Sequence, residues 1–587
     1  MLRRERMKGA MNINFVKPEF LNIKICELQY GGLFACEFTS ATDDLTGKDF
    51  IEVVWYQPLI DIHCVWSCGT TVSKNLRVEI DSSLTTLAPI ACFMNNQGMN
   101  RYSVAFSDCL NPSRLIIEVH EESSSLQCSL KFSPPATVQQ NHKAATLLID
   151  LRSVPYYEAL QDIAHWYEQA AGYQPLSVPA CAKQPMYSTW YSFHQNLDPV
   201  EIENQCLLAR DLGFSTIIVD DGWQTDDNNR RYAFVGDWSV TPAKFPDFKA
   251  HVQRVHDLGM KFMLWFSVPY VGIQSAAWNQ FKDKLLYFSP DQKAGILDLR
   301  YPEVRQYLLG IYDRFVLDYD IDGLKLDFID EMVEAEADPL QMADAEGRDL
   351  RSVPVAVDIF LRDLITRVQA RKPEFMYEFR QKYTGPAMRQ YGNIFRVADC
   401  PNDYQTNRVN SIDLRLLAGN TAVHSDMIMW NQADRVENAA LQLINVLFAV
   451  PQFSMRIDEL SAEHARMSRF YLEFMSRNAD VLLDGQLMPY YPALHYPVVE
   501  SRTEDKCVIA VYGQFAVHRG KNLPRLTYII NGTLANEIIF DFAQPCQGTM
   551  VIYNCQGQVV HQSEVSFMEG PAKISVPAAG LIELLNA

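Results

Sequence analysis

The chain has 587 residues, 48% of them hydrophobic and 21% charged, which is typical of a soluble globular protein with two to four domains. Its formal net charge of −19 argues against nucleic acid or an anionic membrane surface as a partner. The 13 cysteines show no zinc-binding spacing, and the chain is too long for a disulfide-stapled scaffold. The basic start is not followed by the apolar run of a signal peptide, and no stretch approaches the roughly 20 apolar residues of a membrane helix. We therefore expect a cytoplasmic protein with reduced thiols.

The first third of the chain alternates short apolar runs with polar turns. Residues 76–80 and 114–119 are examples of such runs. Many short strands at this spacing predict a β-sandwich, which we place at residues 1–180. A predicted helix at residues 156–171 leads out of it, and the Pro- and Ala-rich residues 173–185 form a linker.

From residue 186 the pattern changes to alternating strands and helices. We predict strands at residues 186–191, 216–220, 261–266, 321–330, 374–379, 394–398, 421–428 and 453–455. We predict helices between and after them at residues 199–213, 248–259, 302–317, 354–371, 433–450 and 464–478. Eight such units predict a (β/α)8 barrel, which we place at residues 181–484. Strand patterns return after it, as at 506–512 and 526–530, and predict a small antiparallel β-domain at residues 485–587.

The fourth predicted barrel strand ends in a charged pair. Lys325 and Asp327 lie two residues apart, so they share one face of the strand. A neighbouring ammonium group lowers the pKa of a carboxylate and keeps it ionised. Catalytic groups of barrels sit at this C-terminal end of the strands. From this stretch alone, a structural ion pair is an equal alternative.

Polar and aromatic residues follow the other strands in the same way. Asp220 and Asp221 come directly after the second strand, where they either cap the loop or accept hydrogen bonds from sugar hydroxyls. Trp265, at the end of the third strand, is a candidate for the floor of a pocket, and Trp190, in the first strand, is a candidate for substrate binding. Two further candidates for lining the pocket share a face of the fifth strand, Glu378 and Arg380.

Glycoside hydrolysis needs two carboxylates that face each other across such a barrel mouth. Asp327 suits the ionised nucleophile. The second carboxyl must be protonated, so we expect it to lack a close cation or to lie in a drier place, and we choose Asp399. Asp403 and Asp426 are alternatives, and both Asp426 and Arg396 are candidates for substrate binding.

Two histidines near the strand ends, His194 and His424, are more typical of structural roles. Their separation gives no metal-ligand spacing, so we predict no metal and no cofactor.

Four blocks of sequence together resemble the α-galactosidases and melibiases, and most closely glycoside hydrolase family 36. The blocks are 219–223 with 236–238 and 244–246, then 259–266, then 297–299 with 302–305, and finally 323–328. The resemblance implies that Asp327 is the nucleophile of a retaining mechanism and that Asp399 is the acid/base. It also implies that Asp220, Asp221, Trp265 and Lys325 bind the sugar, without a metal or nucleotide. Family members are often oligomeric, so a homo-oligomer is expected.

The sequence departs from the family pattern around the fifth strand. The family has a segment similar to Cys-Ser-Gly-Gly before the acid/base strand, whereas this chain has the residues Tyr377–Tyr383. Arg300–Tyr301 stands where the family has Ser-Arg, and Ser267–Pro269 replaces Glu-Pro-Glu. These departures suggest that the glycone is a modified or charged sugar rather than plain galactose.

The leading prediction is a retaining α-glycosidase, most simply an α-galactosidase, that acts on oligosaccharides or glycosides. A transglycosylase on the same scaffold, as in raffinose synthases, is the close alternative. A carbohydrate-binding protein without catalysis is an alternative of a different class, and Lys325 with Asp327 argues against it. A metal-dependent hydrolase that uses His424 and Asp426 is the least favoured.

Overall fold

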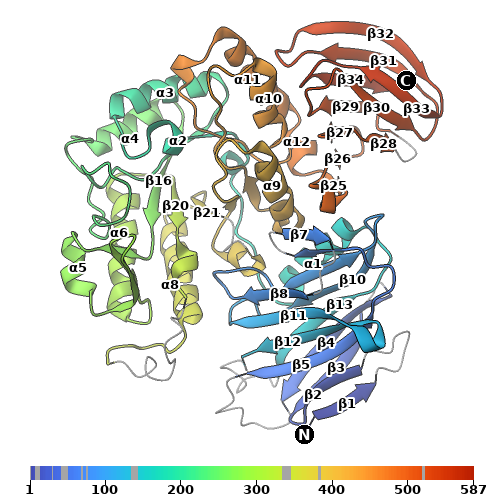
Figure 1. The fold of residues 1–587 in the computed structure, drawn as a ribbon. Coiled ribbons are helices and arrows are strands. Elements are labelled where there is room, and N and C mark those ends of the chain that lie inside the picture. The colour runs from blue at the N-terminus through green and yellow to red at the C-terminus, as the bar shows by residue number, and fades with distance from the viewer. Residues whose placement is uncertain are drawn as a thin grey trace.

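A computed structural model describes residues 2–6, 14–28, 31–40, 50–67, 70–73, 77–133, 143–333, 346–380, 385–518 and 523–586. It has three regions in chain order: β-sheets, a barrel surrounded by helices, and β-sheets again (Figure 1). The predicted fold class is therefore confirmed.

The N-terminal region consists of two antiparallel sheets that face each other across an apolar core. β5 (Ile51–Pro58) shows why they pack: its buried and more exposed residues alternate, so that one face enters the core. The six-stranded sheet has the order β1 (Leu2–Arg6), β2 (Asn14–Pro18), β5, β12 (Ser125–Phe132), β11 (Ser113–His120) and β8 (Arg77–Ser82). The seven-stranded sheet has the order β3 (Leu21–Glu27), β4 (Leu33–Ser40), β13 (Lys143–Asp150), β10 (Asn100–Phe106), β9 (Ile90–Met94), β6 (Cys64–Ser67) and β7 (Thr70–Ser73).

The central region is a parallel eight-stranded barrel that is nearly closed. Its strands, in chain order, are β14 (Met186–Ser188), β15 (Thr216–Val219), β16 (Lys261–Ser267), β20 (Gly323–Asp327), β21 (Met376–Arg380), β22 (Ile394–Arg396), β23 (Ala422–His424) and β24 (Gln452–Phe453). Neighbours in this order pair in parallel, except that β23 and β24 meet only through the bridges His424–Val450 and Ile428–Phe453. β14 pairs with β24, which completes the ring.

Seven of the described helices around the barrel follow the predicted pattern, and four others are additions. Together they are α1 (Tyr156–Gln169), α2 (Trp190–Phe193), α3 (Pro199–Asp211), α4 (Phe248–Asp257), α5 (Ala276–Phe281), α6 (Pro302–Asp318), α8 (Val353–Gln369), α9 (Tyr404–Ala418), α10 (Val436–Ile444), α11 (Ala462–Arg477) and α12 (Ala479–Leu483). The additions are α2, α5, α9 and α12, and α2 begins within residues 186–191, which were predicted as the first strand. A small sheet lies between β16 and β20, in the order β17 (Tyr270–Gly272), β19 (Ala294–Leu297) and β18 (Leu285–Ser289).

The barrel interior is apolar at one end and charged at the other. Ala182, in a short 3-10 helix ahead of β14, packs into a buried cluster at the N-terminal ends of the strands, with Met186, Ile218, Met263, Met376, Ile394 and Ala422. Two residues further along their strands come Asp220, Trp265, Glu378 and Arg396, as alternation in a strand requires. The apolar end therefore closes the barrel, and the polar side chains gather at the opposite end.

The C-terminal region has a seven-stranded and a three-stranded sheet. The first has the order β25 (Gln486–Tyr490), β26 (Val498–Arg502), β27 (Lys506–Val511), β29 (Leu526–Asn531), β34 (Leu581–Asn586), β31 (Cys546–Tyr553) and β32 (Val559–Phe567). The second has the order β28 (Ala516–His518), β30 (Glu537–Phe542) and β33 (Gly570–Ser575). The expectation of an antiparallel domain was wrong for two strand pairs. β27 pairs with β29 in parallel, and β28 pairs with β30 in parallel. Between β27 and β29 the chain passes through β28, which belongs to the second sheet, so that β29 runs in the same direction as β27.

Two further features concern the whole described chain. The predicted boundaries at residues 180/181 and 484/485 stay predictions, because one buried cluster runs through all three regions. In the described part of the chain, every helix is too short or too polar to cross a bilayer.

Candidate active site

Asp327 ends β20, and donors from three directions hold its carboxylate. Arg380 Nε, on the neighbouring β21, donates to Asp327 Oδ1 at 2.6 Å. The Phe328 amide donates to the same oxygen at 2.9 Å, and the Trp265 indole Nε1 donates to Oδ2 at 3.0 Å. The carboxylate is therefore fixed in orientation at the C-terminal end of a barrel strand, where the sequence predicted it.

The charges around Asp327 keep it ionised. Burial by itself raises the pKa of Asp327, but Arg380 and then Lys325 lower it, as does the Trp265 hydrogen bond. The result is a pKa of about 2, below the usual value of 3.8. The sequence predicts Lys325 as the main cause of this low pKa, whereas Arg380 contributes more because it contacts the carboxylate directly.

The ammonium group of Lys325 contacts a different carboxylate. Its Nζ lies 2.6 Å from Asp220 Oδ2, and both side chains are buried. Asp220 also accepts the amide of Asp221 on Oδ1, and its own amide donates to Thr189 Oγ1. Strands β15 and β20 are thus joined across the barrel by an ion pair that lies beside Asp327.

Asp221 points toward two glutamine amides. Gln195 Nε2 donates to Oδ2 at 2.7 Å and Gln224 Nε2 donates to Oδ1 at 2.6 Å. Burial raises the pKa of Asp221 to about 6, although the two amides oppose the shift. The next residue, Gly222, has a φ of +117° and lies so close to Gln195 that a Cβ atom would be 2.5 Å from its Cα. The turn after β15 therefore requires glycine.

Arg396, at the end of β22, contacts three carboxylates. Its Nη1 donates to Asp399 Oδ1 and to Asp426 Oδ1, each at 2.8 Å. Its Nε lies 3.7 Å from Glu378 Oε1. Glu378 is fully buried, and its other oxygen accepts the amide of Gln452. Glu378 therefore lies inside the barrel as part of a charged layer.

Asp399 is the accessible member of this group, because its side chain is 51% exposed. Burial raises its pKa, and so does the charge of Asp327, but Arg396 and Lys325 outweigh them and lower it. The expectation that the second carboxyl lacks a close cation is thus not met at Asp399. The charge of Asp327 therefore acts on Asp399.

The alternatives for the second carboxyl have other partners. Asp403 caps the N-terminus of α9, accepting the amide of Thr406 at 3.0 Å and its hydroxyl at 2.6 Å. Asp426 has no exposed surface. Asp399 is therefore the best placed of the three to reach a substrate.

The two histidines have structural partners. The buried His424 ring contacts the Ala182 carbonyl through Nε2 at 2.8 Å, and burial lowers its pKa to about 4. His194 packs edge-on against Trp190, and Arg230 Nη2 contacts its ring. Among the described residues, no group of three or more His, Cys, Asp or Glu side chains could hold a metal ion.

Comparisons with known proteins identify relatives of this chain. The Melibiase family matches residues 182–379, which run from the 3-10 helix ahead of β14 to β21. The chain is a distant homologue of the melibiase and family 36 α-galactosidases. An α-galactosidase of Escherichia coli is 27% identical over 201 residues, which are 32% of this chain and 28% of that protein. Alpha-galactosidase 1 of Pediococcus pentosaceus is 32% identical over 149 residues, which are 24% of this chain and 19% of that protein.

Solved structures extend the likeness of fold beyond the matched sequence. The α-galactosidase of Lactobacillus brevis superposes with a TM-score of 0.68 at 14% identity, covering 100% of this chain and 85% of that one. The family 36 enzyme AgaA of Geobacillus stearothermophilus gives 0.66 at 13% identity, covering 98% and 82%. This melibiase homologue thus has the family architecture over its whole length, whereas the detectable sequence match to the curated relatives spans under a third of their length.

The predicted departure from the family pattern lies at and after β21, and it stays a prediction. Glu378 and Arg380 in β21 are described, whereas Gln381, Lys382 and Tyr383 lie outside the described residues. Arg380 contacts Asp330 Oδ1 through Nη2 at 3.2 Å, in addition to Asp327. β21 therefore contributes a guanidinium group directly to the candidate nucleophile.

Aromatic residues that the sequence did not predict pack against one another beside Asp327. Tyr232 stacks on Tyr270 with ring centroids 4.9 Å apart and on Trp265 at 6.1 Å, and Phe328 meets it edge-on. Burial raises the pKa of Tyr232, as do the nearby charges of Asp221 and Asp327. Tyr232 lies in the long loop after β15, where no strand pattern predicts its position. Trp190 lies apart from this stack, in α2, with the Arg230 guanidinium over its ring.

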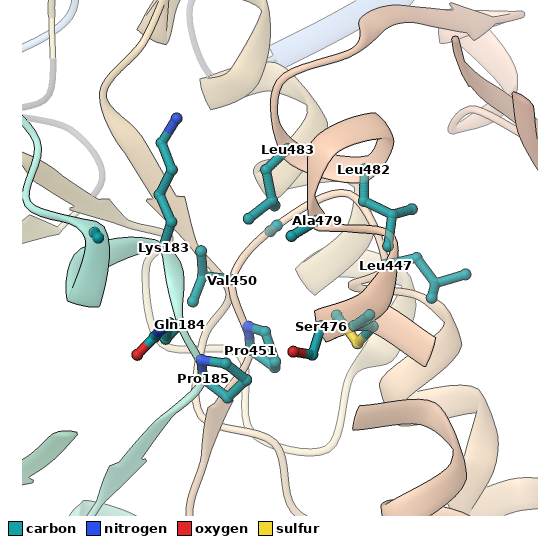
Figure 2. Close-up of a pocket in the computed structure, with 13 residues that line it drawn as sticks. Lys183, Gln184, Pro185, Leu447, Val450, Pro451, Ser476, Ala479, Leu482 and Leu483 are labelled. Carbon is teal, nitrogen blue, oxygen red and sulfur yellow. The ribbon is translucent and has the colours of Figure 1, made fainter. Parts of the chain in front are cut away.

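A cavity of about 220 Å³ lies at the other end of the barrel (Figure 2). It is bounded by Pro185 and Pro451, which precede β14 and β24, and by side chains of α11 and α12 such as Met475 and Leu482. Its lining is mostly apolar. The cavity is therefore separate from the carboxylates of the candidate active site.

Proposed function

We propose that this protein is a retaining α-glycosidase of the α-galactosidase type. The observation that supports it most is the carboxylate of Asp327, which ends a barrel strand and is held ionised by Arg380 at 2.6 Å. An ionised carboxylate with a fixed orientation is what a nucleophile at an anomeric carbon requires. The half-exposed Asp399 supplies the second carboxyl group.

The electrostatic coupling of the two carboxyl groups suits a two-step reaction. In the first step, Asp327 attacks the anomeric carbon and Asp399 gives a proton to the leaving oxygen. While Asp327 is charged it raises the pKa of Asp399, and so it opposes Arg396 and Lys325, which hold that pKa below its usual value. Once Asp327 is esterified, its charge is gone and the pKa of Asp399 falls. Asp399 is then a carboxylate that can take a proton from water in the second step.

The charges of the site favour a neutral glycone over an anionic one. Each of its cations is already paired with a carboxylate: Lys325 with Asp220, Arg380 with Asp327 and Arg396 with Asp399. Asp221 and Asp426 add further acidic groups nearby. A sugar carboxylate or sulfate would meet a surplus of negative charge. A neutral α-galactoside is therefore the substrate class we propose.

The relatives indicate which glycosides to test first. AgaA variants have been crystallised with raffinose and with stachyose, and these structures share the fold of this chain. We extend this to the present protein as a proposal: it acts on terminal α-galactosyl residues of such oligosaccharides. The cytoplasmic location and a homo-oligomeric state stay part of the proposal.

The test is a panel of aryl α- and β-glycosides with the wild type and with Asp327→Ala. We expect cleavage of the α-galactoside, and a loss of roughly 10⁴-fold or more in the variant. A fluorinated galactosyl substrate should leave a covalent adduct on the wild type that peptide mass mapping places at Asp327. Binding of α-galactosides without cleavage by the wild type would contradict the proposal and indicate a carbohydrate-binding protein.

Hydrolysis and transglycosylation share the covalent intermediate, so the products separate them. Raffinose should be converted to free galactose and sucrose when a sugar acceptor is present in excess. Predominant transfer of galactose to the acceptor would instead identify a transglycosylase on the same scaffold.

A further inference from the structure

Asp426 is surrounded by donors from three separate elements. Its Oδ1 accepts from Arg396 Nη1 at 2.8 Å. Its Oδ2 accepts from the hydroxyl of Tyr191 in α2 at 2.8 Å and from the backbone amide of Cys400 at 2.7 Å. The side chain has no exposed surface, so all of its bonding capacity is directed at the protein. A role in direct contact with substrate does not fit this arrangement.

The backbone of Asp426 is held as firmly as its side chain. The Asp426 amide donates to Asn407 Oδ1 at 2.9 Å, and Asn407 Nδ2 donates to the Asp426 carbonyl at 3.2 Å. Asn407 belongs to the first turns of α9. The backbone of Asp426 therefore links the end of β23 to the start of α9.

Two of these contacts reach the residue that we assign as acid/base. Cys400 directly follows Asp399, so its amide fixes the backbone on one side of Asp399. Arg396 Nη1 is shared between Asp426 Oδ1 and Asp399 Oδ1, which fixes the Asp399 side chain. Asp399 itself is half exposed, and a side chain so exposed needs such tethers to hold one position.

We propose that Asp426 is a positioning residue that holds Asp399 in place for proton transfer. The inference rests on the proposed glycosidase function and adds a residue to it. The hydroxyl of Tyr191 also donates to Asp426, so that α2, which contains Trp190, is bonded to the same carboxylate. Asp426 thus connects the loops that follow the first, sixth and seventh barrel strands.

The test replaces Asp426 by asparagine, which keeps the shape but turns one acceptor oxygen into a donor. The new side-chain NH2 group then faces either Arg396 or both Tyr191 and Cys400, all of which are donors themselves. One of the hydrogen bonds that hold Asp399 in place is therefore lost. We expect kcat/KM to fall roughly 10- to 100-fold for raffinose, whose leaving group needs a proton. For a dinitrophenyl α-galactoside, which needs no proton from the enzyme, the fall should be less than about 3-fold. Added azide should raise kcat of the variant on this aryl substrate, because azide attacks the intermediate without a general base.

Two further variants separate positioning from folding. Asp403→Asn alters the cap of α9 in the same loop and should change raffinose and aryl cleavage by equal factors, without azide rescue. Tyr191→Phe removes a single donor and should show the raffinose-selective loss in a weaker form, even if Asp426→Asn does not fold. Equal losses on both substrates in the Asp426 and Tyr191 variants would overturn the inference while leaving the glycosidase function intact. A wild type that cleaves neither substrate would overturn the proposed function itself.

Discussion

The carboxylate of Asp327 depends on its neighbours for its charge. Burial in the barrel mouth opposes ionisation, and Arg380 makes the largest favourable contribution through a 2.6 Å contact. Lys325 and Arg396 add to it from greater distance. The acid form of Asp327 cannot act as a nucleophile, so the lower limit of the active pH range follows from these cations.

Replacing Arg380 by glutamine should narrow the pH range in which the protein is active, because activity is lost at a higher pH on the acid side. The pKa of Asp327, about 2 in the wild type, should rise by roughly one unit or more when the cation is removed. Activity that requires ionised Asp327 then falls earlier as the pH is lowered. The acid limb of kcat/KM for an aryl α-galactoside measures this, with Arg380→Lys as the control that keeps the charge. An acid limb at the same pH in Arg380→Gln and the wild type would contradict the assignment.

Single residues also show where prediction from the sequence ends. Asp327, Lys325 and Asp220 were singled out because each lies at a strand end, and the structure brings them together. The ion pair of Lys325 with Asp220, and not with Asp327, depends on how the strands are staggered around the barrel. Tyr232 comes from a long loop without periodicity. Contacts between elements that lie far apart in the sequence leave no recognisable pattern in the sequence of either element.

Among the elements, the turn after β15 places Asp220 and Asp221 at the barrel mouth. Gly222 allows this turn because it adopts a φ of +117° against the Gln195 backbone. Gln195 in turn donates to Asp221. The position of the acidic pair is thus coupled to the loop after α2 by one close backbone approach.

Gly222→Ala should therefore destabilise the protein and weaken its activity. The left-handed backbone and the 2.5 Å approach of the new Cβ to Gln195 both oppose alanine, at a total cost of roughly 2 to 4 kcal/mol. Gly213→Ala is a matched control, because Gly213 has a φ of +91° and its Cβ would meet open space. We expect thermal unfolding to show a clearly larger loss for Gly222→Ala, and only this variant to lose kcat/KM. Equal losses in both variants would show that backbone strain alone decides the effect.

The eight strands and most helices were predictable because each carries its own pattern. Apolar runs such as Ile217–Val219 and Phe262–Phe266 are long enough to identify buried strands. The helix α9 was missed, although Asp403 ahead of it is a typical N-cap residue. The parallel pairing of β27 with β29 could not be predicted, because strand order is set by packing between the two C-terminal sheets.

At the level of the whole molecule, one buried carboxyl group joins all three regions. Asp413, in α9 of the barrel, accepts on Oδ1 from Trp66 Nε1 of the N-terminal β6 at 2.8 Å and from the Tyr496 hydroxyl just before β26 at 2.5 Å. In the described part of the chain, its Oδ2 is buried without a hydrogen-bond partner. α9 lies between the barrel and the two β-regions in Figure 1. The same helix carries Asn407, which bonds Asp426, so the helix links this junction to the candidate active site.

The junction should make the stability of the protein depend on pH in a defined direction. Burial raises the pKa of Asp413 from 3.8 to about 7, although Tyr496 and Trp66 oppose the shift. The native state therefore binds a proton that the unfolded chain releases above pH 4. The free energy of unfolding then falls as the pH rises from about 4 to 7, by on the order of 1 to 4 kcal/mol.

Asp413→Asn removes this titration while keeping an oxygen acceptor for both donors. We expect the variant to lose stability relative to the wild type at pH 5, and to lose less or even to gain at pH 8. Denaturant unfolding of both proteins at pH 5, 6.5 and 8 measures the difference, with Asp403→Asn as a control acid in the same helix whose pKa is lowered instead of raised. A difference between wild type and Asp413→Asn that is the same at all three values would show that Asp413 stays ionised, and that the contacts among the three regions are those of a charged carboxylate.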